Sequence, residues 1–219
     1  MPRPLKVGVL ASGEGTTFEG LADAIANDAG SVRIAVVVSD RPAAPVLERA
    51  RARGLPTAVV PVKGVAPEVW SERLSETLSA HGVELVVLAG FLPILPSNWV
   101  AQWRGRAINT HPSLLPRYGG HGMYGRHVHE AVLAAGDRES GVTVHLITDA
   151  LDAGPPISQE RAPVLPGDTP ESLRQRLHPV EVALLAATVR RFGDGSLPLP
   201  YPGGDERERE PRVAPERRR

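Results

Sequence analysis

An amide and an imidazole stand two residues apart in the run Ala107-Ile108-Asn109-Thr110-His111-Pro112. On an extended segment, side chains i and i+2 point to the same side, so Asn109 and His111 are expected to face one point. Pro112 cannot donate to a sheet ladder, which predicts that the strand ends there. A lone Asn or His at a strand end is most often a turn former. The pair, placed just before a rigid loop, instead favours a functional site at the carboxyl end of a strand.

Such a pair suits reactions in which an oxyanion develops and protons move. An amide N–H can donate to the oxyanion, and an imidazole can donate or transfer a proton near neutral pH. Ser113 lies in a proline-rich setting unlike a nucleophile elbow, so it is interpreted as structural.

Alternating apolar strands and helices must position this pair. The pattern predicts an α/β fold, with a Rossmann-like, mostly parallel sheet flanked by helices. The predicted strands cover residues 5–10, 33–40, 57–62, 85–89, 142–148 and 156–163, of which 142–148 alternates like a half-buried strand. The predicted helices pass through residues 18–25, 43–53, 67–80, 97–103 and 127–135, with a last helix after Thr169 that Pro179 should kink or split.

A glycine-rich turn, Gly13-Glu14-Gly15-Thr16-Thr17, joins the first strand to the first helix. A strand, turn and helix in this order present free backbone N–H groups to an anion. The turn is not a Walker loop, because no Gly-Lys-Ser/Thr sequence follows. On this motif alone, an anion site and a tight turn without a ligand are equally compatible with the sequence.

The composition is that of an ordinary globular chain. Its 219 residues are 42% hydrophobic and 23% charged, and 25 basic residues balance 25 acidic ones, so charge gives no indication of a nucleic-acid partner. The absence of cysteine excludes disulfides, thiolate nucleophiles and cysteine-based metal sites. No signal peptide and no membrane span are predicted, and a cytoplasmic location is expected.

The run Asn-Thr-His-Pro-Ser-Leu-Leu-Pro at 109–116 closely resembles the signature of the folate-dependent formyltransferases, and the resemblance extends over about Lys6 to Leu199. It implies the formyltransferase fold and 10-formyltetrahydrofolate as the formyl donor, with no metal. Within the family, the purine-synthesis branch is the most similar. The implied reaction is transfer of the formyl group to the glycine amine of glycinamide ribonucleotide on the pathway to IMP. The implied catalytic residues are Asn109, His111 and Asp152, the last from an Asp-x-Gly segment.

The resemblance also implies binding residues. The substrate phosphate and glycinamide end would be held by Gly13, Gly15, Thr16, Thr17 and Glu181. The folate would be held by Phe91, Leu92, Pro93, Ile94, Leu95, Val100, Asn109, Ile147, Thr148 and Asp152. The chain departs from the family pattern in two places: Thr16-Thr17 stands where Ser-Asn is frequent, and Pro93 stands where Arg is frequent.

The sequence leaves rival functions open and also predicts the role of three histidines, the domain limits and the partners. A sugar-amine formyltransferase, a formyltetrahydrofolate deformylase and a non-catalytic nucleotide-binding module remain the rival functions. His121, His127 and His129 are expected to line a glycine-rich loop and cap the next helix rather than bind a metal. Residues 1–202 are expected to form the catalytic domain and 203–219 a disordered charged tail. The expected partners are small molecules, without nucleic acid or membrane, and the chain is expected to be a monomer or homodimer.

Overall fold

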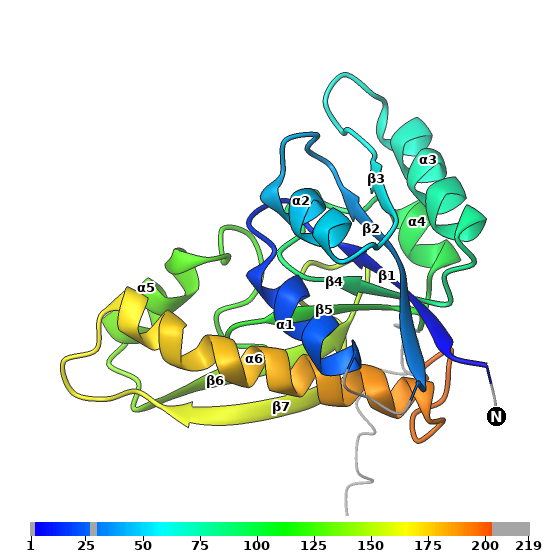
Figure 1. The fold of residues 1–219 in the computed structure, drawn as a ribbon. Coiled ribbons are helices and arrows are strands. Elements are labelled where there is room, and N and C mark those ends of the chain that lie inside the picture. The colour runs from blue at the N-terminus through cyan, green and yellow to red at the C-terminus, as the bar shows by residue number, and fades with distance from the viewer. Residues whose placement is uncertain (1–2, 27–29, 203–219) are drawn as a thin grey trace, which may run out of the picture.

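The structure, a computed structural model, describes residues 3–26 and 30–202 and is built on one seven-stranded sheet (Figure 1). The strand order is β3-β2-β1-β4-β5-β6-β7. The strands are β1 (Leu5–Leu10), β2 (Val32–Ser39), β3 (Thr57–Val59), β4 (Leu85–Leu88), β5 (Ala107–His111), β6 (Glu139–Leu146) and β7 (Pro156–Pro163). The five strands from β3 to β5 in this order are parallel, and β6 pairs antiparallel with both of its neighbours, β5 and β7. This confirms the predicted mostly parallel α/β sheet.

Helices cover both faces of the sheet. They are α1 (Thr16–Ala26), α2 (Pro45–Ala52), α3 (Pro67–Ala80), α4 (Ser97–Gln102), α5 (Arg126–Ala134) and α6 (Pro170–Gly193). One apolar core joins the sheet to α1, α2 and α6, and a second joins the opposite face to α3 and α4. Figure 1 shows α1 and α6 side by side on one face and α3 beside α4 on the other. The predicted bounds of β1, α3 and β7 are confirmed.

The chain enters and leaves its helices where the sequence signals indicate. Gly54 adopts φ 68° directly after α2, the left-handed conformation that ends a helix at low steric cost. Thr169 caps α6 through a reciprocal capping box with Ser172, followed by Pro170 in the first turn. β3 is shorter than predicted and ends at Val59.

The prediction for β6 is wrong, and at Pro179, where a kink or a split was expected, the split is absent. β6 is buried on both faces rather than half-buried, because α5 and α6 pack on one face while Leu115 N–H donates to Thr143 Oγ1 on the other, at 3.1 Å. Helix α6 is uninterrupted rather than split at Pro179. The hydrogen bond lost at Pro179 would have ended on the carbonyl of Gln175, an exposed residue where water can take its place.

The C-terminal end of the described chain packs on the core. Tyr201 N–H donates to Gly105 O at 2.8 Å, and the Tyr201 ring meets Phe192 edge to face. The predicted disordered tail, 203–219, lies outside the described residues.

Helix α1 lies so close to α6 that only glycine fits at the contact. A Cβ atom built on Gly20 would lie 2.5 Å and 2.7 Å from the two Cγ atoms of Val182. This approach sets the distance between the amino end of α1 and the middle of α6, which both border the cavity described below.

We expect Gly20→Ala to destabilise the fold by about 1–3 kcal/mol through overpacking, although Ala has a helix propensity better by about 1 kcal/mol. Thermal and urea unfolding measure the change. In a Val182→Ala background the same substitution should be neutral or stabilising. A stabilising effect of Gly20→Ala in the unaltered chain would contradict the close approach.

Candidate active site

A cavity of about 700 Å³ opens at the carboxyl ends of β1, β4 and β5. The sheet runs outward from β1 through β2 in one direction and through β4 in the other, so this is the topological switch point where open α/β sheets bind ligands. The loops after β1 and β4 are joined here, since Ser12 N–H donates to Gly90 O at 3.0 Å and Leu92 N–H donates to Ser12 Oγ at 2.9 Å.

The cavity brings together most of the residues singled out in the sequence. Those that line it are Thr16, Thr17, Phe91, Leu92, Pro93, Ile94, Leu95, Asn109, His111, Ile147, Thr148, Asp152 and Glu181. Gly13, Gly15 and Val100 do not line it.

The two glycines act on the backbone of the turn. Gly15 adopts φ 77°, and its carbonyl accepts from Glu19 N–H at 2.9 Å, so it caps α1. Gly13 O accepts from Val46 N–H at 3.1 Å and ties the turn to α2. Thr16 and Thr17 then present the first backbone N–H groups of α1, which have no acceptor within the helix, at the cavity.

Val100 lies in the core instead of the cavity. Its side chain is 6% exposed and belongs to the apolar cluster against which Phe91 and Leu95 pack. The sequence-based expectation that it contacts the folate is therefore not supported; it lies behind the wall formed by those two residues.

One wall of the cavity is apolar and unusually exposed. Leu92 and Ile94 are 49% and 67% exposed, and Leu151 in the facing loop is 47% exposed. Phe91 stacks on the buried Trp70, with ring centroids 6.4 Å apart and an interplanar angle of 11°. Large apolar side chains gathered at a concave surface indicate a binding site for an apolar or aromatic group.

At the floor of the cavity, β5 and β6 bring Asn109 opposite His145. The two are directly paired in the antiparallel ladder, and Asn109 Nδ2 lies 3.2 Å from His145 Nε2. His145 Nδ1 lies 2.9 Å from Leu146 O, and because a carbonyl only accepts, Nδ1 carries the proton. Nε2 is then an acceptor, so Asn109 donates one N–H to it and keeps a second N–H for a ligand.

The neutral state of His145 follows from its surroundings. The residue is 1% exposed, and burial lowers the pKa of its imidazole; the Leu146 carbonyl and Asp152 oppose this shift. A neutral ring with a proton on Nδ1 is the form that fixes the orientation of the Asn109 amide.

Asp152 stands between two buried histidines. Its Oδ1 lies 3.7 Å from His145 Nε2, and its Oδ2 lies 3.7 Å from His111 Nδ1. Oδ2 also accepts from Gly120 N–H at 3.0 Å. Asp152 adopts φ 53°, a left-handed conformation that among non-glycine residues Asp and Asn tolerate best. The contact with Gly120 is a direct hydrogen bond, whereas both histidine nitrogens lie beyond hydrogen-bonding distance of the carboxylate.

His111 is held from the opposite side. The ring is 4% exposed, and its Nε2 lies 2.7 Å from Tyr118 O, so Nε2–H donates to that carbonyl. Nδ1 faces Asp152. Sequence reasoning therefore placed Asn109, His111 and Asp152 together correctly.

His145 was missed. The signal available was the period-two pattern of β6, in which Thr143 and His145 put polar groups on the same side of an otherwise apolar strand. In a half-buried strand, polar side chains are expected on the side that faces water. A fully buried histidine instead needs a hydrogen-bond partner.

Three further polar residues border the cavity on α5 and α6: His129, Arg174 and His178. His178 Nδ1 lies 3.5 Å from Glu181 Oε2. His129 is buried, and desolvation, with a smaller contribution from Arg174, lowers the pKa of its imidazole. These groups line the same cavity as Thr16 and Thr17 at the amino end of α1.

The loop histidines differ in part from the expectation. His121 lines the cavity. The N-cap of α5 is Gly125 and no side chain caps this helix, so the expected capping by His127 or His129 is wrong. His127 pairs instead with Glu130, one turn further along the helix. Among the described residues, no group of three or more His, Cys, Asp or Glu side chains is placed to hold a metal ion.

Comparison with known proteins gives a consistent family assignment. The formyl transferase family model matches residues 5–189. The phosphoribosylglycinamide formyltransferase of Escherichia coli K12 is 34% identical over 196 residues, covering 89% of this chain and 90% of that protein. The trifunctional purine biosynthetic protein adenosine-3 of Drosophila melanogaster is 40% identical over 182 residues, which are 82% of this chain but 13% of that protein.

A solved structure supports the same assignment. The phosphoribosylglycinamide formyltransferase of Coxiella burnetii superposes with a TM-score of 0.83 and 39% identity, covering 89% of this chain and 90% of that one. In the part of the chain that the structure describes, no helix is long and apolar enough to span a membrane.

We expect His145 to be mainly neutral, with its proton on Nδ1, at pH 6.5, where a free imidazole is about half protonated. Nitrogen-15 NMR of the histidine side chains measures both properties, and His145→Gln identifies the signal. Asn109→Ala should shift the Nε2 resonance and leave the Nδ1 proton in place. A proton on Nε2, or a ring at least half protonated at this pH, would contradict the geometry.

Proposed function

We propose that this chain, which belongs to the formyl transferase family, transfers a formyl group from 10-formyltetrahydrofolate to the glycine amine of glycinamide ribonucleotide in de novo purine biosynthesis. The observation that carries the proposal is one arrangement within one cavity. Asn109, His111 and Asp152 meet between an exposed apolar wall and the amino end of α1. A pterin-like ring and a phosphate ester are the ligands that those two ends suit.

The phosphate of the ribonucleotide is assigned to the start of α1. The N–H groups of Thr16 and Thr17 and the positive end of the helix dipole favour an anion. The glycinamide end is assigned to Glu181, whose carboxylate can hold an ammonium or amide N–H on the α6 side. The threonines retain hydroxyl and backbone donors, so the departure from Ser-Asn leaves this assignment intact.

The folate is assigned to the wall formed by residues 91–95 and the facing loop 147–152. Phe91, Leu92 and Ile94 offer apolar surface to the ring. Pro93 offers neither a side-chain cation nor a backbone N–H, so an arginine contact present elsewhere in the family has no equivalent at this position.

In the reaction, the neutral amine forms a bond to the formyl carbon, and the formyl oxygen becomes an oxyanion. The free N–H of Asn109 and a protonated His111 are placed to donate to that oxygen. The bond to the folate nitrogen then breaks, the amine loses a proton, and the departing nitrogen gains one. His111 suits this proton transfer because it lines the cavity, with its Nδ1 on the side of Asp152.

Asp152 acts through charge. Its carboxylate lies 3.7 Å from His111 Nδ1 and stabilises the imidazolium that the reaction requires. The dry surroundings strengthen this attraction, since His111 and Asp152 side chains are 5% and 9% exposed.

The proposal carries several further expectations. The chain needs no metal, acts on small molecules without nucleic acid or membrane, and resides in the cytoplasm as a monomer or homodimer. Residues 1–202 suffice for catalysis.

A formyl-transfer assay tests the function. The purified protein is given 10-formyltetrahydrofolate with glycinamide ribonucleotide, with an amino-sugar nucleotide, or with no amine. Formylated glycinamide ribonucleotide should be the main product. Equal folate turnover without an amine would indicate a deformylase, and preference for the amino sugar would indicate a sugar-amine enzyme. The absence of turnover in every arm would favour a non-catalytic binding module. Each of these three results contradicts the proposal.

We expect Asp152→Asn to lower kcat by about 100-fold or more, the order that acid–base catalysis contributes, with little change in either KM. Asparagine keeps the shape and tolerates φ 53°. Because coupled residues are non-additive, adding Asp152→Asn to His111→Ala should cost little more than His111→Ala alone. Losses that multiply would show that the two residues work independently.

The phosphate site predicts a charge-specific effect at Thr16. Thr16→Asp should raise the KM for glycinamide ribonucleotide by about tenfold or more, since two unit charges a few Å apart interact by roughly 1–4 kcal/mol. Thr16→Asn, the neutral control of equal size, should have a much smaller effect. The folate KM should stay within about twofold in both, on the same electrostatic argument. Equal effects of the two variants, or an equal rise in the folate KM, would refute the assignment.

A further inference from the structure

Tyr118 lies outside the cavity lining yet contacts His111 through its backbone. Its carbonyl accepts from His111 Nε2–H at 2.7 Å. Its φ of 56° is left-handed, a conformation that is strained for a bulky residue and that persists only where the surroundings impose it. This φ turns the Tyr118 carbonyl toward β5, so something must hold the residue there.

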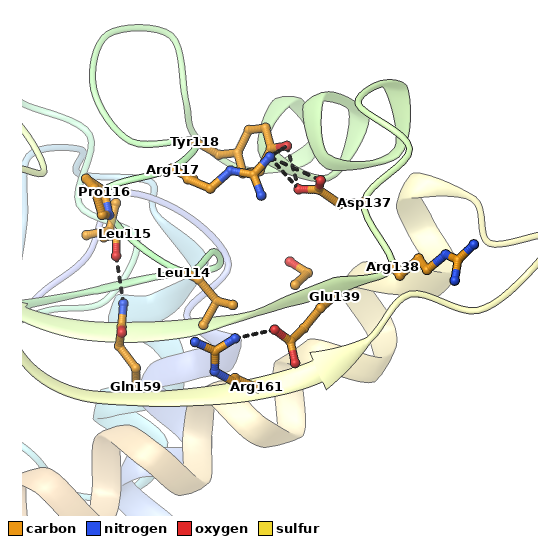
Figure 2. Close-up of a pocket in the computed structure, with 11 residues that line it drawn as sticks. Leu114, Leu115, Pro116, Arg117, Tyr118, Asp137, Arg138, Glu139, Gln159 and Arg161 are labelled. Carbon is orange, nitrogen blue, oxygen red and sulfur yellow. Dashed lines mark hydrogen bonds and ion pairs between the residues drawn. The ribbon is translucent and has the colours of Figure 1, made fainter.

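The side chain of Tyr118 is held on the far side of the same loop. Its hydroxyl donates to Asp137 Oδ2 at 2.7 Å, in the turn between α5 and β6. The Arg117 guanidinium lies 5.0 Å above the ring. It donates to Tyr118 Oη at 2.9 Å and to Asp137 Oδ1 at 3.1 Å. Figure 2 shows the three groups converging beside a second cavity of about 380 Å³.

The protonation states agree with a hydrogen bond of defined direction. Burial, followed by the contact with Asp137, raises the pKa of the Tyr118 phenol. Donation from Tyr118 and then from Arg117 lowers the pKa of Asp137. The phenol therefore stays the donor and the carboxylate the acceptor across neutral pH.

The residues that follow Tyr118 contact Asp152, the partner of His111 in the proposed mechanism. Gly120 N–H donates to Asp152 Oδ2 at 3.0 Å. A Cβ on Gly119 would lie 3.1 Å from Asp152 Cβ, so this backbone packs directly on the aspartate. Residues 118–120 thus contact His111 with a carbonyl and Asp152 with an N–H.

We propose that Tyr118 is a positioning residue, whose phenol, anchored on Asp137 with Arg117, holds the 118–120 backbone that aligns His111 with Asp152. Loss of the anchor frees the left-handed backbone to relax, and the His111 Nε2 hydrogen bond loosens with it. The proposal rests on the proposed function for its kinetic consequence, but its geometric consequence is independent of any activity.

The first test is structural and needs no turnover. In the full chain, the His111 Nε2 proton should give a low-field NMR signal that exchanges slowly with water. Tyr118→Phe, which removes only the hydroxyl, should speed this exchange at least about tenfold, consistent with loss of one hydrogen bond of roughly 1–2 kcal/mol. Tyr201→Phe, a matched phenol deletion at the other end of the protein, should leave the signal unchanged. An unchanged signal in Tyr118→Phe would overturn the proposal.

The second test is kinetic. Tyr118→Phe should lower kcat about tenfold and displace its pH profile while both KM values stay within about twofold, because the lost contact aligns reacting groups rather than binding ligands. Asp137→Asn keeps an acceptor and should retain most of kcat, whereas Asp137→Ala should match Tyr118→Phe. Equal losses in the two Asp137 variants, or KM values that rise as kcat falls, would overturn the positioning role. The Asp137 pair serves as the test if Tyr118→Phe does not fold.

The experiments distinguish an error in the proposed function from an error in the proposed role of Tyr118. If no formyl transfer is detected in the unaltered protein while the His111 proton still responds to Tyr118→Phe, the function is wrong and the anchor stands. If transfer is detected and the proton does not respond, the function stands and the anchor is wrong.

Discussion

The antiparallel pairing of β5 with β6 determines the geometry of the reacting centre. Its register sets Asn109 opposite His145, and the buried, neutral imidazole then orients the amide. The loop that joins β6 to the antiparallel strand β7 then places Asp152 between two histidines.

The surrounding fold supplies two chemically different ends to this centre. The loop after β4 exposes apolar side chains because its own backbone is tied to Ser12 and its Phe91 rests on Trp70. The turn after β1 exposes backbone N–H groups because Gly15 caps α1, whose first residues, Thr16 and Thr17, line the cavity. Close packing of α1 on α6 at Gly20 holds the second end at a defined distance from Glu181. Binding and chemistry therefore depend on separate elements joined by the sheet.

Much of this could be predicted from the sequence. Continuous apolar runs such as 85–88 and helical spacing as in 67–80 are local signals, and the elements they predict are present. The Asn109–His111 spacing and the proline after it located the centre. Long-range effects could not be predicted in the same way. β6 owes its burial to the loop 112–118 above it, and His145 owes its role to a pairing partner 36 residues away. Val100 is apolar like the residues of the cavity wall, but helix α4 directs its side chain into the core.

The central claim is that one cavity holds both substrates with the formyl group over Asn109 and His111. A crystal structure with a bisubstrate analogue, a folate joined to glycinamide ribonucleotide, tests it most directly. The account predicts the phosphate at the N–H groups of Thr16 and Thr17 and the pterin against residues 91–95. The atom in place of the formyl oxygen should lie within hydrogen-bond reach of Asn109 Nδ2 and His111 Nδ1. An analogue bound with its phosphate or its pterin elsewhere, or with that atom directed away from both side chains, would contradict it.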